Sequence, residues 1–156
     1  MQFPIKEFTN SPESTETVGH ALASALARDK SLPRFVAMYG DLGVGKTAFV
    51  RGFCSELCRG ATVKSPTFAL VNEYRCPVPM GGIKRVYHFD MYRITDEDDL
   101  YSIGFYDYLD RRGICLVEWS ENIPYALPDR YVRVEIIKNN ADQPDSRLIT
   151  AEIIGD

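Results

Sequence analysis

The chain has 156 residues, with 18 lysines and arginines against 22 aspartates and glutamates, so its formal net charge is −4. This length suits one domain, and the hydrophobic fraction of 45% indicates a globular fold with its own core. The acidic balance and the lack of a basic stripe argue against strong direct binding of nucleic acid. The sequence holds no run of 18 apolar residues and no apolar signal core at its start, so we expect a cytoplasmic protein without a membrane span.

Four cysteines are spread over the chain, at positions 54, 58, 76 and 115. Their spacing contains no Cys-x-x-Cys pair and no zinc-binding pattern. Cys54 and Cys58 would share one face of a helix, which leaves a metal or redox pair open as an alternative. We expect buried, reduced thiols.

The first sixty residues alternate between strand-like and helix-like segments. Residues 3–8 are expected to form a short edge strand. Ser11, followed by a proline, offers a helix cap, and apolar residues then recur at helical spacing through residues 15–28. The apolar run at residues 34–39 predicts a buried strand, and residues 46–58 predict a second helix.

The rest of the chain is predicted to be rich in strands. Further strands are expected at residues 68–74, 85–89, 114–117, 130–138 and 147–154. Residues 77–82 hold two prolines and two glycines and predict a loop. Thr95 is expected to cap a helix, since an aspartate follows three residues later. Asn139, Asn140 and Pro144 punctuate the last two strands, which therefore predict a C-terminal antiparallel hairpin.

The strongest chemical signal is a glycine-rich segment after the second strand. Gly40-Asp41-Leu42-Gly43-Val44-Gly45-Lys46-Thr47 matches the phosphate-binding pattern G-x-x-x-x-G-K-[ST]. The glycines let backbone N–H groups approach phosphate oxygens closely, and the following helix adds the positive end of its dipole. Lys46 would reach the β and γ phosphates, and the Thr47 hydroxyl would bind Mg²⁺. The strand before this loop and the helix after it are the context that the motif requires, so the sequence predicts a nucleotide site.

The alternation of strands and helices favours a layered α/β architecture. We expect residues 1–156 to form a single domain with the three-layer fold of P-loop NTPases. Its sheet is expected to be mostly parallel and to end in the C-terminal antiparallel hairpin.

Two carboxylates follow predicted strands and are candidates for the metal side of this site. Asp90 follows the strand at 85–89, and Glu118 follows the strand at 114–117. The carboxyl ends of parallel strands line the ligand crevice of an open α/β sheet, so both side chains are expected to face the phosphates. A solvated carboxylate at a strand end is the alternative for each. The chain lacks the Asn-Lys-x-Asp segment of guanine-specific switches, which favours ATP over GTP.

Four segments together resemble the TsaE (YjeE) family, small bacterial P-loop ATPases of tRNA threonylcarbamoyladenosine biosynthesis. They are the glycine-rich loop, the S-P-T-F segment at 65–68, the H-F-D-x-Y-R segment at 88–93 and the E-W pair at 118–119. The resemblance implies an Mg²⁺-dependent ATPase that works with TsaB- and TsaD-type protein subunits, which modify adenosine 37 of tRNA. It also implies that this chain reaches tRNA only through those partners.

The resemblance further implies roles for individual residues. Thr47 and Glu118 would hold Mg²⁺, and Asp90 would lie beside the γ-phosphate and the attacking water or the metal. Catalysis is therefore assigned to Lys46, Asp90 and Glu118, and residues 65–68 would form a switch-like loop. The residues expected to bind ATP are Thr15, Asp41, Leu42, Gly43, Val44, Gly45, Lys46, Thr47, Asp90 and Arg147.

Other polar residues have simpler explanations beside functional ones. His88 is interpreted as a hydrogen-bonded packing residue, with a role as base or switch left open. The acidic run at residues 96–99 suits the first turn of a helix, where the dipole favours negative charge. Arg93 either stabilises phosphate charge or pairs with a carboxylate.

Three other functions stay open at this point. A small-molecule kinase would share the loop but needs an acceptor pocket and an arginine-bearing lid, for which Arg111 and Arg112 are the available pair. A nucleotide-dependent assembly module would bind ATP without hydrolysing it. Direct RNA binding by this chain is disfavoured by its charge.

Overall fold

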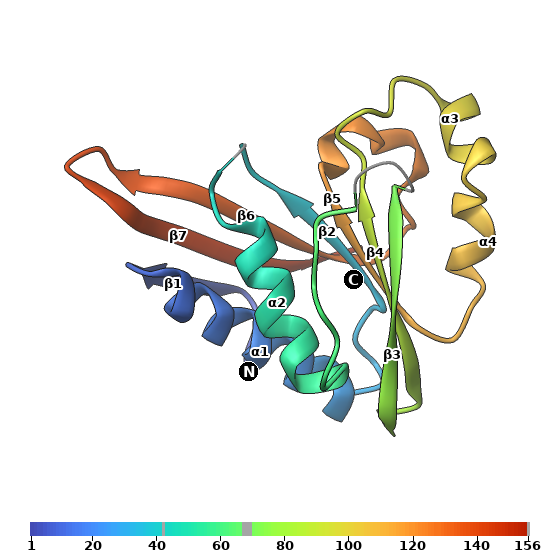
Figure 1. Cartoon of the computed structure of the whole chain (residues 1–156), viewed down its shortest axis with the longest axis horizontal. Coiled ribbons are helices and arrows are strands. Elements are labelled where there is room, and N and C mark those ends of the chain that lie inside the picture. The colour runs from blue at the N-terminus through green and yellow to red at the C-terminus, as the bar shows by residue number, and fades with distance from the viewer. Residues whose placement is uncertain (42, 67–69, 156) are drawn as a thin grey trace.

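The computed structural model describes residues 1–41, 43–66 and 70–155. These residues form one seven-stranded sheet with the order β1-β7-β6-β2-β5-β4-β3 (Figure 1). The strands are β1 (Ile5–Thr9), β2 (Phe35–Tyr39), β3 (Val71–Met80), β4 (Ile83–Asp90), β5 (Ile114–Glu118), β6 (Tyr131–Asn140) and β7 (Gln143–Ile154). The expectation of an α/β fold is confirmed, and its strands form one sheet.

Helices pack on both faces of this sheet. They are α1 (Pro12–Arg28), α2 (Lys46–Leu57), α3 (Glu97–Ser102) and α4 (Phe105–Leu109), with short 3₁₀ turns η1 (Ser120–Asn122) and η2 (Pro124–Ala126). Alternate residues of β2 point to opposite faces, as the pleat requires. Val36 joins the core under α1 and α2, whereas Phe35 joins the core that includes Phe105 of α4. No helix among the described residues has the length and apolar character needed to cross a bilayer.

The expectation of a mostly parallel sheet is wrong. Parallel pairing is confined to the centre, where β6 joins β2, β2 joins β5 and β5 joins β4. Antiparallel pairing joins β1 to β7, β7 to β6 and β4 to β3, and these pairs contain more of the registered residues. The edges are antiparallel because hairpins, rather than crossover helices, connect β3 to β4 and β6 to β7. The C-terminal antiparallel hairpin itself is confirmed.

The loop predicted at residues 77–82 is also wrong in part. β3 continues through both prolines to Met80, and the chain turns at Gly81 and Gly82 into β4. A proline cannot donate to a strand ladder, so prolines are tolerated mainly on edge strands. β3 is the edge strand of the sheet, which explains why Pro77 and Pro79 do not end it.

Local capping signals largely match the structure. Ser11 caps α1, its side chain accepts from the Ser14 backbone N–H, and the Ser14 side chain completes the capping box. For α3 the cap is Asp96, one residue after the predicted Thr95, and its side chain accepts from the Asp99 N–H. The four cysteines are free and buried, as expected.

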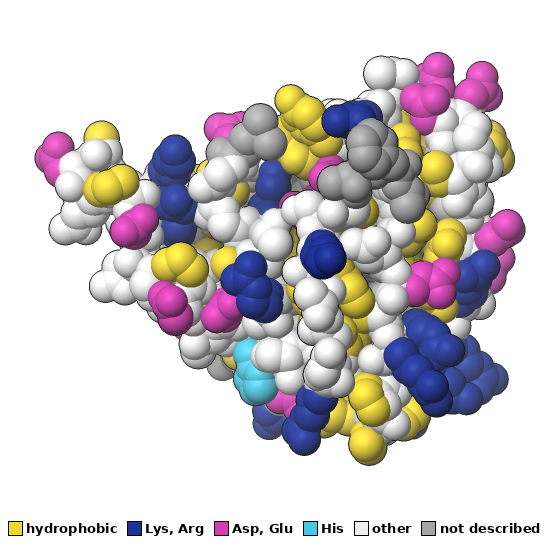
Figure 2. Space-filling model, in the orientation of Figure 1, with side chains coloured by type: hydrophobic (Ala, Val, Ile, Leu, Met, Phe, Trp, Pro, Cys, Tyr) yellow, Lys and Arg dark blue, Asp and Glu magenta, His cyan; other side chains and the backbone are white. Residues whose placement is uncertain are grey.

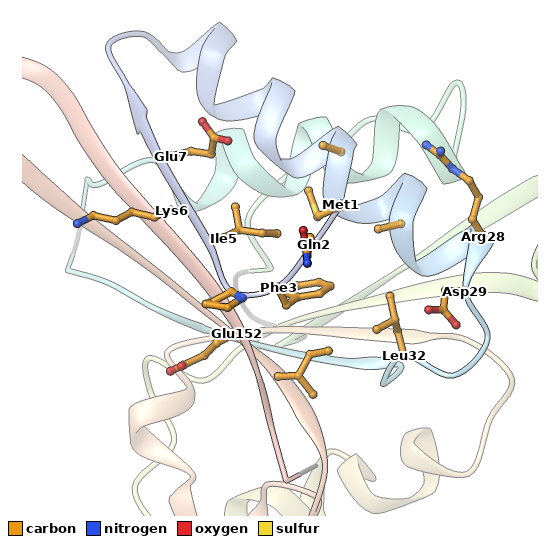
Figure 3. Close-up of a pocket in the computed structure, with 14 residues that line it drawn as sticks. Met1, Gln2, Phe3, Ile5, Lys6, Glu7, Arg28, Asp29, Leu32 and Glu152 are labelled. Atoms are coloured by element: carbon orange, nitrogen blue, oxygen red, sulfur yellow. The ribbon is translucent and has the colours of Figure 1, made fainter.

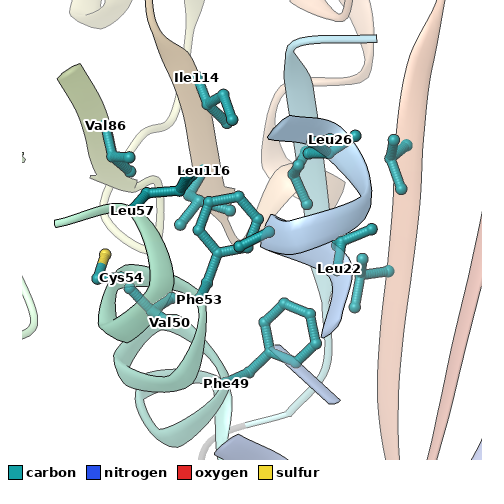
Figure 4. Packing of buried hydrophobic residues seen from close by; sticks show 14 of the residues in the cluster. Leu22, Leu26, Phe49, Val50, Phe53, Cys54, Leu57, Val86, Ile114 and Leu116 are labelled. Atoms are coloured by element: carbon teal, nitrogen blue, oxygen red, sulfur yellow. The ribbon is translucent and has the colours of Figure 1, made fainter. Parts of the chain in front are cut away.

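The core beneath α1 and α2 fixes the position of the glycine-rich loop. Phe49 and Phe53 of α2 pack among Leu22 of α1 and the β5 residues Ile114 and Leu116 (Figure 4). All five side chains are almost fully buried. Because α2 begins directly after the loop, this packing anchors the loop at the carboxyl end of β2.

The two helices approach so closely that glycine is needed where they meet. A Cβ at Gly52 would lie 1.9 Å from the carbonyl oxygen of Glu16, and a Cβ at Gly19 would lie 2.2 Å from that of Phe49. Both obstacles are backbone atoms, which cannot rotate away. The close contact between α1 and α2 therefore depends on the absence of a side chain at Gly19 and at Gly52.

We predict that Gly52→Ala lowers the free energy of unfolding by about 2 kcal/mol, because the new methyl group forces α1 and α2 apart. Helix propensity alone predicts the opposite sign, a gain of about 1 kcal/mol. Urea denaturation monitored by circular dichroism measures the difference. Thr17→Ala, at an exposed position of α1, serves as the control and should change stability by less than about 0.5 kcal/mol. A stabilised Gly52→Ala protein would contradict the close packing.

Candidate functional site

The glycine-rich loop lies between β2 and α2, at the edge of the sheet where the parallel strands end. A Cβ at Gly40 would lie 2.7 Å from the carbonyl oxygen of Ile136 in β6, so only glycine fits there. Gly45 begins α2 in the left-handed conformation, with φ of 105°, and no side chain caps this helix. The first turn of α2 also contains no acidic residue. The uncapped N–H groups and the helix dipole make this end of α2 suited to an anion.

Arg147 from β7 holds the loop from outside. Its Nε donates to the carbonyl oxygen of Val44 at 2.8 Å, and its Nη2 donates to that of Gly43 at 3.3 Å. The residue predicted to reach the nucleotide is therefore next to the loop and bound to its carbonyls. These two hydrogen bonds occupy carbonyl oxygens of the loop and leave its N–H groups out of the contact.

Thr15 of α1 lies on the other side of the same loop. A Cβ at Gly45 would lie 3.9 Å from its methyl carbon. The side chain is buried, and its hydroxyl shares a hydrogen bond of 3.1 Å with that of Thr9. The structure thus brings Thr15 to the loop, and its contact with adenine stays a prediction.

The loop residues themselves differ in exposure. Asp41 and Gly43 are exposed, whereas Val44 is buried. The predicted loop residue Leu42 and the predicted switch residues Thr67 and Phe68 lie outside the described residues.

Lys46 points back across the loop toward the sheet. Its ammonium group donates to the carbonyl oxygen of Gly40 and lies 3.8 Å from the centre of the Trp119 ring. Burial lowers the pKa of Lys46, and the nearby charges of Glu118 and Asp90 act in the opposite direction. The lysine is thus held between the loop and the two predicted carboxylates.

Thr47 contacts the predicted switch segment. Its hydroxyl lies 3.0 Å from that of Ser65. Pro66 follows, and Ser65 and Pro66 line a small pocket of about 130 Å³ together with Asp90. The structure therefore brings the loop, the switch segment and one carboxylate to the same place.

Asp90 and Glu118 end neighbouring parallel strands and are paired directly in register. Glu118 is buried, with 4% of its surface exposed, and Asp90 is half-buried. Burial raises the pKa of Asp90, and the charge of Glu118 acts in the same direction. The Asp90 carboxylate accepts one hydrogen bond, from the backbone N–H of Tyr92 at 2.9 Å. Both predicted carboxylates therefore face the same edge as the glycine-rich loop.

His88 belongs to this site more firmly than its sequence context indicates. The imidazole is fully buried, and its Nε2 lies 2.5 Å from Oε2 of Glu118. Sequence reasoning favoured a packing role for it. The sequence signal for a role in the site is the alternation of side chains along β4, which places His88 on the same face of the sheet as Asp90. That face meets the one that carries Glu118 on β5.

The residues present fit a phosphate group with Mg²⁺. The described residues contain no cluster of three His, Cys, Asp or Glu side chains that could hold a metal by themselves. Mg²⁺ is usually bound by one or two carboxylates together with substrate phosphates and water, so it does not require such a cluster. Thr47 and Glu118 supply oxygen atoms of the type this ion prefers.

A larger pocket lies elsewhere. It has a volume of about 1120 Å³ and is lined by the N-terminal residues Met1 to Glu7, by α1 and by β7 (Figure 3). Its charged side chains are of both signs, including Lys6, Glu7 and Glu152. None of the loop residues or carboxylates discussed above lines it, so its size does not make it the candidate site.

Basic side chains gather at the opposite end of the sheet. Figure 2 shows Lys and Arg side chains clustered at the lower right, beside the ends of β3 and β4. A pocket of about 530 Å³ near this end is lined by five basic residues, Lys30, Arg34, Arg111, Arg112 and Arg130. Arg111 and Arg112 precede β5, whereas Glu118 ends it, and five residues of strand span about 16 Å. This placement does not support the arginine lid that a kinase would need.

We predict that Asp90→Asn stabilises the protein at pH 7. When folding raises the pKa of a carboxyl, the protein loses stability as the pH rises from the ordinary pKa of that group, near 3.8, through its pKa in the folded state. An amide keeps the acceptor for Tyr92 and removes the buried charge, so the gain should reach up to about 1 kcal/mol after solvent screening. Urea denaturation at pH 7 and pH 3.5 measures it, and the gain should disappear at the lower pH.

Asp99→Asn is the matched control, with the opposite sign. Hydrogen bonds from the backbone N–H and hydroxyl of Thr95 lower the pKa of Asp99, so its contribution to stability is present at neutral pH and lost in acid. Its amide variant should therefore be less stable than the natural protein at pH 7. If Asp90→Asn is instead no more stable than the natural protein at pH 7, the burial of Asp90 has no such effect.

Comparison with known proteins identifies the family. The family model for the threonylcarbamoyl adenosine biosynthesis protein TsaE matches residues 9–149. The chain is 35% identical over 151 residues to the tRNA threonylcarbamoyladenosine biosynthesis protein TsaE of Bacillus subtilis, covering 97% of this chain and 87% of the relative. It is 43% identical over 101 residues to TsaE of Haemophilus influenzae, covering 65% and 61%.

A solved structure agrees with these sequence matches. The crystal structure of YdiB from Bacillus subtilis superposes with a TM-score of 0.74 and 29% sequence identity, covering all of this chain and 88% of that one. Fold, sequence similarity and family model therefore point the same way, and the chain belongs to the TsaE family of threonylcarbamoyl adenosine biosynthesis proteins.

Proposed function

We propose that this chain is an Mg²⁺-dependent P-loop ATPase required for threonylcarbamoylation of adenosine 37 in tRNA. One observation carries the proposal. The uncapped start of α2, Lys46, Asp90 and Glu118 converge at one edge of the sheet, although they come from three separate segments. Membership in the TsaE family supports the pathway.

The phosphate groups of ATP would lie on the glycine-rich loop. The N–H groups at the start of α2 would donate to phosphate oxygens, and Arg147 would keep the loop in shape through Val44 and Gly43. Lys46 would leave the carbonyl of Gly40 and turn toward the β and γ phosphates, which are stronger acceptors for an ammonium group.

The metal side would be formed by Thr47 and Glu118. Mg²⁺, when bound there, supplies charge neutralisation at the β and γ phosphate oxygens. Asp90 would orient the attacking water, and its raised pKa suits a carboxylate that accepts a proton. Buried Glu118 would stay fixed, because His88 holds it.

The partners are proposed from the family. TsaB- and TsaD-type subunits would carry out the transfer to tRNA, and hydrolysis by this chain would drive or reset their complex. The acidic balance of the chain suits a subunit that leaves RNA contact to its partners. We expect weak ATPase activity for the chain alone and higher activity in the complex.

We predict that Lys46→Ala lowers ATP turnover at least about 100-fold in the presence of the partners, because a charge aimed at the transferred phosphate is lost. Phosphate release with Mg²⁺, and with EDTA in its place, measures turnover and its metal dependence. Lys30→Ala removes a lysine at the opposite end of the sheet and should leave turnover unchanged. Equal turnover in the Lys46→Ala and natural proteins would refute the ATPase proposal.

A second experiment separates hydrolysis from assembly. A non-hydrolysable ATP analogue should permit at most one round of tRNA modification per complex. Multiple rounds with the analogue would show that nucleotide binding alone suffices, and the chain would then be an assembly module.

A further inference from the structure

A row of hydrogen bonds begins at buried Glu118 and leads through two further side chains to the Lys64 backbone. Nε2 of His88 donates to Oε2 of Glu118 at 2.5 Å, since a carboxylate oxygen only accepts. Nδ1 of His88 lies 3.4 Å from the hydroxyl of Tyr74 on the neighbouring strand β3. That hydroxyl accepts from the N–H of Lys64 at 3.2 Å and donates to its carbonyl oxygen at 3.1 Å. The row therefore joins a buried carboxylate to the backbone of a distant loop.

The same row of contacts continues to Thr47, the other proposed metal ligand. Lys64 directly precedes Ser65, whose hydroxyl lies 3.0 Å from that of Thr47. Starting from Thr47, the contacts thus run through Ser65, Lys64, Tyr74 and His88 to Glu118. The two residues that would hold Mg²⁺ are the two ends of one connected set of contacts.

The hydroxyl of Tyr74 is the junction of this set. It has one hydrogen and two acceptors within reach, the carbonyl oxygen of Lys64 and Nδ1 of His88. The Lys64 carbonyl has a second donor, Nδ2 of Asn72 at 2.9 Å, so it stays paired when the hydroxyl turns to His88. The hydroxyl can therefore turn to His88 without leaving the Lys64 carbonyl unpaired, and doing so supplies the donor that the buried Nδ1 of His88 needs.

We propose that Tyr74 and His88 are positioning residues that fix Glu118 relative to the Lys64–Ser65 segment, and that this bridge tightens the binding of Mg²⁺ to the nucleotide-bound protein. The proposal rests on the function proposed above. Removing a residue that hydrogen-bonds to a metal ligand typically lowers the affinity for the metal 10- to 100-fold. Tyr74 is not one of the proposed phosphate or metal ligands, and it would act through His88 and Lys64.

The sole tryptophan of the chain provides the readout. Trp119 follows Glu118 and lies against the ammonium group of Lys46, so nucleotide binding that moves Lys46 should change its fluorescence. Affinity for a non-hydrolysable ATP analogue is measured first in EDTA, and the apparent affinity for Mg²⁺ is then measured with the analogue saturating. Neither quantity requires turnover or partner proteins.

Tyr74→Phe removes the hydroxyl and keeps the buried ring. We expect its apparent Mg²⁺ affinity to fall about 10-fold, with the metal-free affinity for the analogue unchanged. His88→Gln keeps one donor and one acceptor and should lose less than His88→Ala. Tyr87→Phe is the matched control, because Tyr87 lies on β4 next to His88 but packs on the other face of the sheet, against Tyr108.

A double-mutant cycle tests the connection itself. If the bridge acts through Ser65, Ser65→Ala and Tyr74→Phe should be non-additive, and the double variant should lose little more Mg²⁺ affinity than the weaker-binding single variant. Additive losses would overturn the bridge. An equal loss of analogue affinity with and without Mg²⁺ would also overturn it, because a loosened fold has that effect.

The failure of the bridge and the failure of the proposed function are distinguishable. Thr47→Ala and Glu118→Gln should both weaken Mg²⁺ binding whether or not the bridge exists. If they do so while Tyr74→Phe and His88→Gln match the natural protein, only the bridge is refuted. If neither ligand variant changes the Mg²⁺ dependence, the metal assignment in the proposed function is refuted as well.

Discussion

The candidate site depends on the parallel pairing of β5 between β2 and β4. This pairing sets Asp90 directly beside Glu118 and brings both to the edge where β2 passes into the glycine-rich loop. A register shift of one residue would turn one carboxylate to the opposite face of the sheet. The contact between His88 and Glu118 would then be lost, so this edge depends on one backbone register.

Local chemistry explains why much of this site is predictable from sequence. The pattern from Gly40 to Thr47 specifies a backbone geometry, a charge and a hydroxyl at fixed spacing, and the described residues of this segment lie between β2 and α2, as the pattern predicts. The cap at Ser11 and the apolar run of β5 are equally local signals. Asp90 and Glu118 are predictable because strand ends in an α/β sheet meet at one edge.

Other features depend on contacts between distant parts of the chain. The prolines of β3 indicate a loop until the strand is known to be at the sheet edge, and the antiparallel edges follow from hairpins with no strong local signal. The basic pocket is formed by residues as far apart as Lys30 and Arg130, so no basic stripe marks it in the sequence. The partners of His88 are likewise found only through the β3–β4 and β4–β5 registers.

The charged side chains of the site differ in burial and in hydrogen bonding, and these differences suit the roles proposed for them. Glu118 is the more buried carboxylate and is held by His88, which suits the fixed position proposed for it as a metal ligand. Asp90 is less buried, accepts one backbone hydrogen bond and has a raised pKa, which suits the proton exchange with water that we propose for it. Lys46 is meanwhile held by a neutral carbonyl and an aromatic ring, weaker partners than phosphate. The free protein thus keeps its charges in place at a cost in stability, and binding of a phosphate with its metal ion would recover that cost.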